Sequence, residues 1–213
     1  MAGYMSEAVI RRLPIYYRYM MLLEKEGVIQ ISSQELGDRM QMTASQIRQD
    51  INAFGGYGRQ GYGYIVQELK EHIRKIMGLN REHRMVIIGA GRMGQAVSNF
   101  ALFPQEGFRT VAMFDIDSRK IRLEEEEIPI YPAEELEERL PGLKAEIVVL
   151  AVPAEAAQET LNRAYSLGIR GIWNFALVDL EYPEDMAVVN VHLSDTLQIL
   201  SYNMKQHRRT AKI

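Results

Sequence analysis

The sequence predicts an α/β protein built from two folded parts and a terminal helix. Two short capped helices and a glycine-rich segment predict an N-terminal winged helix-turn-helix. An apolar strand entering a G-x-G-x-x-G turn then predicts a doubly wound parallel sheet, and a closing amphipathic stretch predicts one last helix. We therefore expect domains at residues 1–78 and 79–190, and a C-terminal helix with its tail at residues 191–213.

Composition places the chain among ordinary globular proteins. It has 213 residues, 47% of them hydrophobic and 25% charged, with a formal net charge of −3. Cysteine is absent, which excludes disulfides and thiolate metal sites, so we expect a reducing compartment and assign no metal site. No apolar run approaches the roughly 20 residues of a membrane span, and no export signal is recognisable. We expect a cytoplasmic protein.

The first part opens with a predicted helix over residues 13–27. Ser32 and Glu35 have the spacing of a capping box, with Ser32 as the N-cap of a helix. In this motif the Ser32 hydroxyl accepts a hydrogen bond from the Glu35 backbone amide, and the Glu35 side chain accepts one from the Ser32 backbone amide. Thr43 repeats the pattern, with Gln46 three residues later. Two short capped helices separated by a tight turn predict a helix-turn-helix.

The second of these helices has two different faces. Ile47, Ile51 and Phe54 recur at helical spacing and predict a buried face. The other face carries side chains that can read base edges in a major groove: Ser45, Arg48, Gln49 and Asn52. A merely solvated helix face is the alternative interpretation.

Charge favours a surface for a polyanion at this end of the chain. Residues 1–78 hold ten lysines and arginines against eight acidic residues, and Asp50 is the only acid between Met40 and Gln67. Statistical scatter would explain the same charge distribution, so charge by itself does not decide.

A glycine- and tyrosine-rich segment, Gly55–Val66, follows the second helix. Its alternation of Tyr62, Tyr64 and Val66 predicts a β-hairpin wing with Arg59 near the tip. An arginine on a slim tip suits a narrow A·T-rich minor groove, where the negative potential is enhanced. A flexible linker is the alternative.

The middle of the chain carries a dinucleotide-binding pattern, which is typical of a Rossmann domain. After the strand Val86–Ile88, Gly89 permits a tight turn, Gly91 lets the backbone approach a pyrophosphate, and Gly94 lets the helix pack on the strand. A second apolar run ends at Asp115, whose carboxylate would accept hydrogen bonds from the adenosine ribose. Because an acid there disfavours a 2′-phosphate, we expect NAD(H) rather than NADP(H).

Two later apolar runs complete the predicted sheet. Residues 146–153 and 171–175 read as buried parallel strands whose C-terminal loops line the ligand crevice. Residues 193–206 read as a helix with one apolar stripe, which in so short a chain is expected to pack on a partner subunit: Leu193, Leu197, Leu200 and Met204.

With these motifs in place, the chain resembles the Rex family of bacterial redox-sensing transcriptional repressors, and most closely its clostridial-type branch. The resemblance covers nearly the whole chain. The matching segments are residues 12–19, 32–36, 43–55, 61–64, 89–94, 114–117, 151–158, 171–175 and 190–195.

The resemblance implies a homodimer that exchanges its C-terminal helices and binds an A·T-rich inverted-repeat operator in double-stranded DNA. It implies that NADH releases the operator and that NAD+ permits binding. The implied cofactor-binding residues are Gly89, Ala90, Gly91, Arg92, Met93, Gly94, Phe100, Asp115, Ile116, Asp117, Ala151, Val152, Pro153, Asn174, Phe175 and His192. The implied DNA-binding residues are Ser45, Gln46, Arg48, Gln49, Asn52, Tyr57, Arg59, Gln60, Gly61 and Tyr62.

Two positions depart from the pattern of many family members. Phe100 stands where many carry a tyrosine near the nicotinamide, and His192 stands where many carry an acid before the last helix. Because a phenyl ring donates no hydrogen bond, a polar switch through position 100 cannot operate unaltered. The two departures therefore leave open how the oxidation state of the cofactor is transmitted to the winged helix-turn-helix.

Two other functions are weighed against this one. A dehydrogenase would need a substrate domain and a pair of residues for acid–base catalysis, and neither is recognisable in the sequence. We therefore expect that the protein is not an enzyme. A nucleotide sensor that has lost DNA binding and acts through a protein partner is the second alternative. Arg48, Gln49 and Arg59 speak against it.

Overall fold

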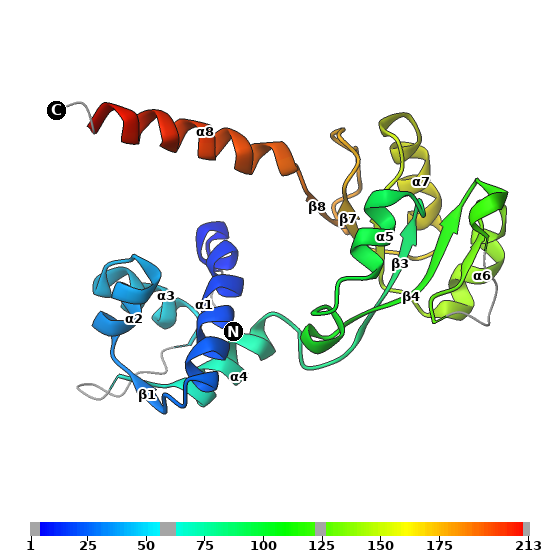
Figure 1. The fold of residues 1–213 in the computed structure, drawn as a ribbon. Helices are drawn as coiled ribbons and strands as arrows, with labels where there is room; N and C mark the ends of the chain where they lie inside the picture. Colours follow the sequence, from blue (N-terminus) through cyan, green and yellow to red (C-terminus); the bar gives the residue numbers. More distant parts are fainter. Residues whose placement is uncertain (1–4, 56–62, 122–126, 211–213) are drawn as a thin grey trace. The chain divides into compact units, whose positions relative to one another are not determined.

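A computed structural model of the chain describes residues 5–55, 63–121 and 127–206 in full, and the backbone of residues 207–210. The chain divides into two compact units, unit 1 (Met1–Arg81) and unit 2 (Glu82–Ile213) (Figure 1). The expected division of the second unit at residue 191 stays a prediction.

The described residues of unit 1 form four helices and a two-stranded antiparallel sheet (Figure 1). Its core includes a stripe along α1 of Val9, Leu13, Tyr16, Met20 and Leu23, which recur every three or four residues. The elements are α1 (Glu7–Lys25), β1 (Gln30–Ile31), α2 (Ser33–Met40), α3 (Ala44–Ala53), β2 (Tyr64–Ile65) and α4 (Val66–Ile76).

Helix α1 begins six residues before the predicted start at Leu13 and passes through Pro14. A proline inside a helix removes one backbone hydrogen bond, here the one to the Ile10 carbonyl. Pro14 lies on the exposed side of α1, where water can hydrate that carbonyl, while the buried stripe continues back to Val9. Burial of this stripe outweighs the local penalty.

The helix-turn-helix is formed by α2 and α3, as predicted. The Ser32 hydroxyl accepts from the Glu35 amide at 3.1 Å, and the Glu35 carboxylate accepts from the Ser32 amide at 2.9 Å. The Thr43 hydroxyl accepts from the Gln46 amide at 3.1 Å, but the Gln46 side chain does not complete a second capping box, because it donates to Asp50 at 2.8 Å.

The strand at the end of the glycine-rich segment ends earlier than the alternation predicted. Tyr64 and Ile65 pair with Ile31 and Gln30, and Val66 is already the first residue of α4. Val66 is 1% exposed because it packs into the helical core of unit 1. The predicted wing tip, residues 57–62, lies outside the described residues.

Unit 2 contains a six-stranded, fully parallel sheet in the order β5-β4-β3-β6-β7-β8. This order is that of the Rossmann fold, as predicted. The strands are β3 (His83–Ile88), β4 (Phe108–Asp115), β5 (Ile130–Pro132), β6 (Ile147–Leu150), β7 (Gly171–Asn174) and β8 (Ala187–Asn190).

Helices cover the two faces of this sheet (Figure 1). Alternate strand residues such as Val86 and Ile88 pack with α6 and α7, whereas Met85 and Ile87 pack with α5. The helices are α5 (Arg92–Ser98), α6 (Leu136–Leu143) and α7 (Ala154–Ser166), with short 3-10 turns η1 (Pro104–Glu106), η2 (Ser118–Lys120) and η3 (Ala133–Glu135).

The chain ends in α8 (Leu193–Thr210), which extends beyond the predicted end at Gln206. All four residues of its predicted apolar stripe are exposed, Leu197 by 67% and Leu200 by 54%. Across the described residues, no helix has the length and apolar character needed to cross a bilayer.

Candidate functional site

The glycine turn lies at the carboxyl end of β3 and leads into α5. Gly89 has φ +103°, and a Cβ added there would lie 2.4 Å from the Ala151 carbonyl oxygen. A Cβ on Gly94 would lie 2.0 Å from the Gly89 carbonyl oxygen. Both positions therefore require glycine, the first for the turn and the second for helix packing.

Gly91 has a different environment. A Cβ built on it would meet no atom within 4 Å, so the space beside its backbone is open. The first amides of α5 follow directly, and amides of a first helical turn have no partner within the helix. Backbone donors next to open space fit a pyrophosphate, which is the group that the sequence assigned to this turn.

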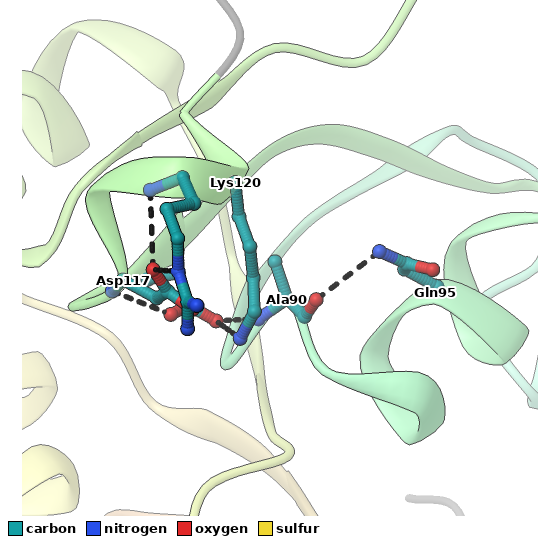
Figure 2. Close-up of polar contacts among 6 residues, drawn as sticks. Ala90, Gln95, Asp117 and Lys120 are labelled. Carbon is teal, nitrogen blue, oxygen red and sulfur yellow. Dashed lines mark hydrogen bonds and ion pairs between the residues drawn. The ribbon is translucent and has the colours of Figure 1, made fainter.

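Asp115 ends β4 beside this turn and is 7% exposed. One carboxylate oxygen, Oδ2, accepts from the Ala90 amide at 2.7 Å and from the Lys120 ammonium at 3.0 Å (Figure 2). The other, Oδ1, accepts from the Asp117 amide at 2.8 Å. Asp115 thus joins the glycine turn to the loop after β4.

Asp117 is held by its own neighbour in that loop. Its carboxylate accepts from the Arg119 guanidinium at 2.8 and 2.9 Å, and this side-chain pairing, with the Arg119 amide, lowers the pKa of Asp117 to about 2. Ile116, between the two acids, is 85% exposed. Ile116 therefore offers an uncovered apolar surface beside Asp115.

The loops after β6 and β7 reach the same edge of the sheet, because carboxyl ends of parallel strands meet there. The Ala151 amide donates to the Ile88 carbonyl at 2.8 Å, and the Phe175 amide donates to the Leu150 carbonyl at 2.9 Å. The structure thereby brings the glycine turn together with residues 115–117, 151–153 and 174–175.

Asn174 is fully buried, and its side chain is engaged within the protein. Its amide nitrogen donates to the Val178 carbonyl at 3.1 Å and to Asn190 at 2.9 Å, while its oxygen accepts from the Ala176 amide at 2.9 Å. These bonds shape the loop after β7, so the side chain of Asn174 positions this loop.

Phe100 lies beyond the end of α5, and a row of aromatic rings joins it to Phe175. Centroid distances along the row are 4.6 Å from Phe100 to Phe103, 5.6 Å from Phe103 to Trp173, and 4.7 Å from Trp173 to Phe175. His192 is half-buried in the link between β8 and α8.

The polar face of α3 in unit 1 is open to solvent. Ser45, Arg48, Gln49 and Asn52 are exposed, whereas Ile47 and Ile51 are completely buried. The Arg48 guanidinium donates to the Ser33 hydroxyl at 3.0 Å, so it is oriented by the start of α2. The two faces of the helix are divided as the sequence predicted.

Asp50 lies on the inner side of α3 and is 1% exposed. Its carboxylate accepts from the Arg12 guanidinium at 2.6 and 2.7 Å, from the Tyr16 hydroxyl at 2.9 Å and from Gln46 at 2.8 Å. Burial raises the pKa of Asp50, but the hydrogen bonds from Arg12, Gln46 and Tyr16 outweigh it and hold the pKa below its ordinary value.

Burial also raises the pKa of Tyr16, and its bond to Asp50 adds to this effect. The acid that the sequence left unassigned therefore anchors α3 to α1. The side chain of Gln46, which the sequence assigned to DNA binding, donates its hydrogen bond to Asp50 and thus helps to hold this buried carboxylate.

Five predicted DNA-binding residues lie outside the described residues: Tyr57, Arg59, Gln60, Gly61 and Tyr62. Sequence reasoning did not assign two cations that pair with buried carboxylates, Arg12 with Asp50 and Lys120 with Asp115. A lysine five residues after the strand-ending acid is a local signal that could have pointed to Lys120. Arg12 had no such signal, because its partner is 38 residues away.

Known families match both units. Residues 5–52 match the family described as "Putative DNA-binding protein N-terminus", and residues 80–178 match the family described as "CoA binding domain".

The described residues contain no group of three or more histidines and acids that could hold a metal ion.

Relatives match nearly the full chain. A protein of Clostridioides difficile (strain 630) named redox-sensing transcriptional repressor Rex is 47% identical over 201 residues, which cover 94% of this chain and 96% of that protein. The fold is also similar to the crystal structure of RSP in complex with β-NAD+ and operator DNA, with a TM-score of 0.89 and 44% sequence identity over 99% of this chain and 97% of RSP. The structure of RSP with β-NADH is 42% identical, with a TM-score of 0.89 over 98% of each chain.

Proposed function

The chain belongs to the Rex family of redox-sensing transcriptional repressors, and we propose that it is a repressor whose operator binding is permitted by NAD+ and released by NADH. One observation carries the proposal: a single chain combines a helix-turn-helix whose polar face is open with a Rossmann turn that requires glycine at Gly89 and Gly94. The similarity to RSP, solved with NAD+ and operator DNA and also with NADH, supports the same pairing of activities.

The DNA-binding half of the proposal rests on α3. Arg48, Gln49 and Asn52 are exposed on one side of a helix whose other side is buried, as a recognition helix in a major groove requires. Ser45 is exposed on the same side. For Tyr57, Arg59, Gln60, Gly61 and Tyr62, the proposal keeps the argument from sequence, in which a basic tip enters an A·T-rich minor groove.

The cofactor half rests on the carboxyl edge of the sheet. Open space at Gly91 fits the pyrophosphate, and the Asp115 carboxylate lies where a ribose would follow. Ile116 would lie against the adenine, and the loops at Ala151–Pro153 and Phe175 would line the nicotinamide end. When bound, the nicotinamide supplies the difference that is sensed, a cationic oxidised ring or a neutral reduced one.

We extend the proposal to a homodimer formed through α8. Six exposed large apolar side chains lie on this helix, and such an uncovered apolar surface is typical of an interface: Leu193, Leu197, Ile199, Leu200, Tyr202 and Met204. A two-fold dimer presents two recognition helices to successive major grooves, which predicts an inverted-repeat operator.

Coupling between the two ligands follows from linkage. If one protein state binds NADH better and DNA worse, DNA weakens NADH binding by the same factor by which NADH weakens DNA binding. A hundredfold difference in NADH affinity between two states corresponds to about 2.7 kcal/mol, which is enough to move a near-balanced equilibrium decisively.

The test measures fluorescence anisotropy of a labelled A·T-rich inverted-repeat duplex at fixed salt, with NADH and NAD+ titrated separately. We expect tight binding that NADH releases and NAD+ does not. Operator binding that persists at saturating NADH would contradict the proposed switch. Binding of both nucleotides without any DNA binding would instead favour a sensor that acts through a protein partner.

Arg48→Ala separates the two halves of the proposal. It should weaken operator binding about fivefold or more, because a good arginine contact to a base contributes about 1–3 kcal/mol. NADH binding, followed by quenching of Trp173, the single tryptophan, should be unchanged. Arg39→Ala is the matched control, because Arg39 is an exposed arginine of α2 that pairs with Glu26.

A further inference from the structure

The expected ribose acceptor, Asp115, already holds three donors. These are the Ala90 amide at 2.7 Å, the Asp117 amide at 2.8 Å and the Lys120 ammonium at 3.0 Å (Figure 2). A carboxylate has about four lone-pair sites for hydrogen bonds. Asp115 can therefore accept from one ribose hydroxyl without losing a bond, but not from two.

Lys120 is the one of these donors that can move. The two amides are fixed in the backbone, whereas the Lys120 side chain is 35% exposed and reaches Asp115 from the 3-10 turn after β4. The neighbouring cation is committed elsewhere, because Arg119 binds both oxygens of Asp117. Because Oδ2 already has two donors, the free acceptor site is on Oδ1, and the Lys120 ammonium on the adjoining Oδ2 lies beside a ribose hydroxyl that binds there.

The ion pair also changes the charge that a ligand would meet. A lone carboxylate would repel a 2′-phosphate, which is the usual basis for preferring NAD(H). Asp115 with Lys120 at 3.0 Å is a pair without net charge, and its ammonium can donate to a phosphate oxygen or to a hydroxyl. The rejection of a 2′-phosphate is weakened accordingly.

We propose that Lys120 is a specificity-determining residue of the ribose subsite, which donates to the ribose 2′-substituent and limits how strongly the protein discriminates against 2′-phosphorylated dinucleotides. The proposal rests on the NAD(H)-binding role proposed above. The two members of the pair then have opposite effects: Asp115 weakens the binding of a 2′-phosphorylated dinucleotide, and Lys120 strengthens it.

The test compares the dissociation constants of NADH and NADPH in the full-length protein, by quenching of Trp173 and by calorimetry. Lys120→Met should raise the ratio of the NADPH constant to the NADH constant about fivefold or more, since an ammonium near a phosphate contributes at least about 1 kcal/mol even at the dielectric constant of water. Lys120→Arg should keep the ratio within about threefold of the unmodified protein, because the charge remains. Asp115→Asn should lower the ratio.

Lys75→Met serves as the matched control, because Lys75 is an exposed lysine of α4 in unit 1. A ratio in Lys120→Met that stays within about twofold of the unmodified protein, or falls, would overturn the proposal. Failure of the proposed function gives a different result, because the unmodified protein would then bind neither dinucleotide.

Discussion

The pair of Arg12 and Asp50 gives the sharpest test of how the recognition helix is held. Arg12→Gln would leave the Asp50 carboxylate, which is 1% exposed, without its countercharge and without two of its four hydrogen bonds. Removing one partner of a buried ion pair costs about 3–5 kcal/mol. Tyr16 and Gln46 still donate to Asp50, and the Arg12 side chain is 26% exposed, so we expect a loss near the lower end, about 3 kcal/mol.

Urea unfolding followed by circular dichroism at 222 nm measures this loss, because unit 1 is mostly helical. Trp173 lies in unit 2, so its fluorescence transition should remain where it is and serves as an internal control. The double variant Arg12→Gln/Asp50→Asn removes the uncompensated charge and should recover at least about 1.5 kcal/mol. A loss below about 0.5 kcal/mol, or a double variant as unstable as the sum of both single variants, would refute the reasoning.

Acid provides an independent check on the same pair. Because the folded protein holds the pKa of Asp50 below its unfolded value of about 3.9, its contribution to stability is present above that pH and is lost as the pH falls through the lower folded value. The loss of stability below about pH 4 should therefore be smaller in Asp50→Asn. If the unmodified protein and Asp50→Asn lost stability equally as the pH falls, the lowered pKa of Asp50 would be contradicted.

Two further predictions concern local geometry. Ser32→Ala removes the hydroxyl that caps α2 and should lower the free energy of unfolding by about 1 kcal/mol, measured by urea unfolding; no loss would mean that water replaces the cap. Gly94→Ala places a Cβ 2.0 Å from the Gly89 carbonyl oxygen, so it should push α5 away from the turn and abolish NADH quenching of Trp173, while operator binding at zero NADH survives. Unchanged NADH affinity in Gly94→Ala would contradict the role of that contact.

Much of the site was predictable because its determinants are local. The capping box at Ser32 and Glu35 spans three residues, and the backbone bonds it requires follow from that spacing. The glycine turn is equally local, since φ +103° at Gly89 and the contact of Gly94 with the Gly89 carbonyl follow from a strand turning directly into a helix. The carboxylate at the end of the next strand then lies beside the turn because parallel strands share an edge.

Predictions that extended a local pattern across a boundary were less accurate. The alternation through Tyr64 and Val66 suggested one strand, but Val66 begins α4 because its side chain packs into the core of unit 1. The apolar spacing predicted a helix that starts at Leu13, but α1 begins at Glu7 because Val9 also joins that core. In both cases tertiary burial outweighed a local preference.

The sequence by itself determined the caps and the glycine turn, because each depends on residues close together in the chain. It also determined the order of the two domains, which is the order of their motifs, and the acid beside the turn, because neighbouring parallel strands end at one edge of a sheet. The tertiary structure alone decided how the charges are used. Asp50 meets Arg12 across 38 residues, and Asp115 accepts both from Lys120 and from the Ala90 amide, which is 25 residues away in the chain. The physical reason is that a charge acts on whatever lies within a few ångströms of it, and folding, rather than sequence spacing, sets those distances.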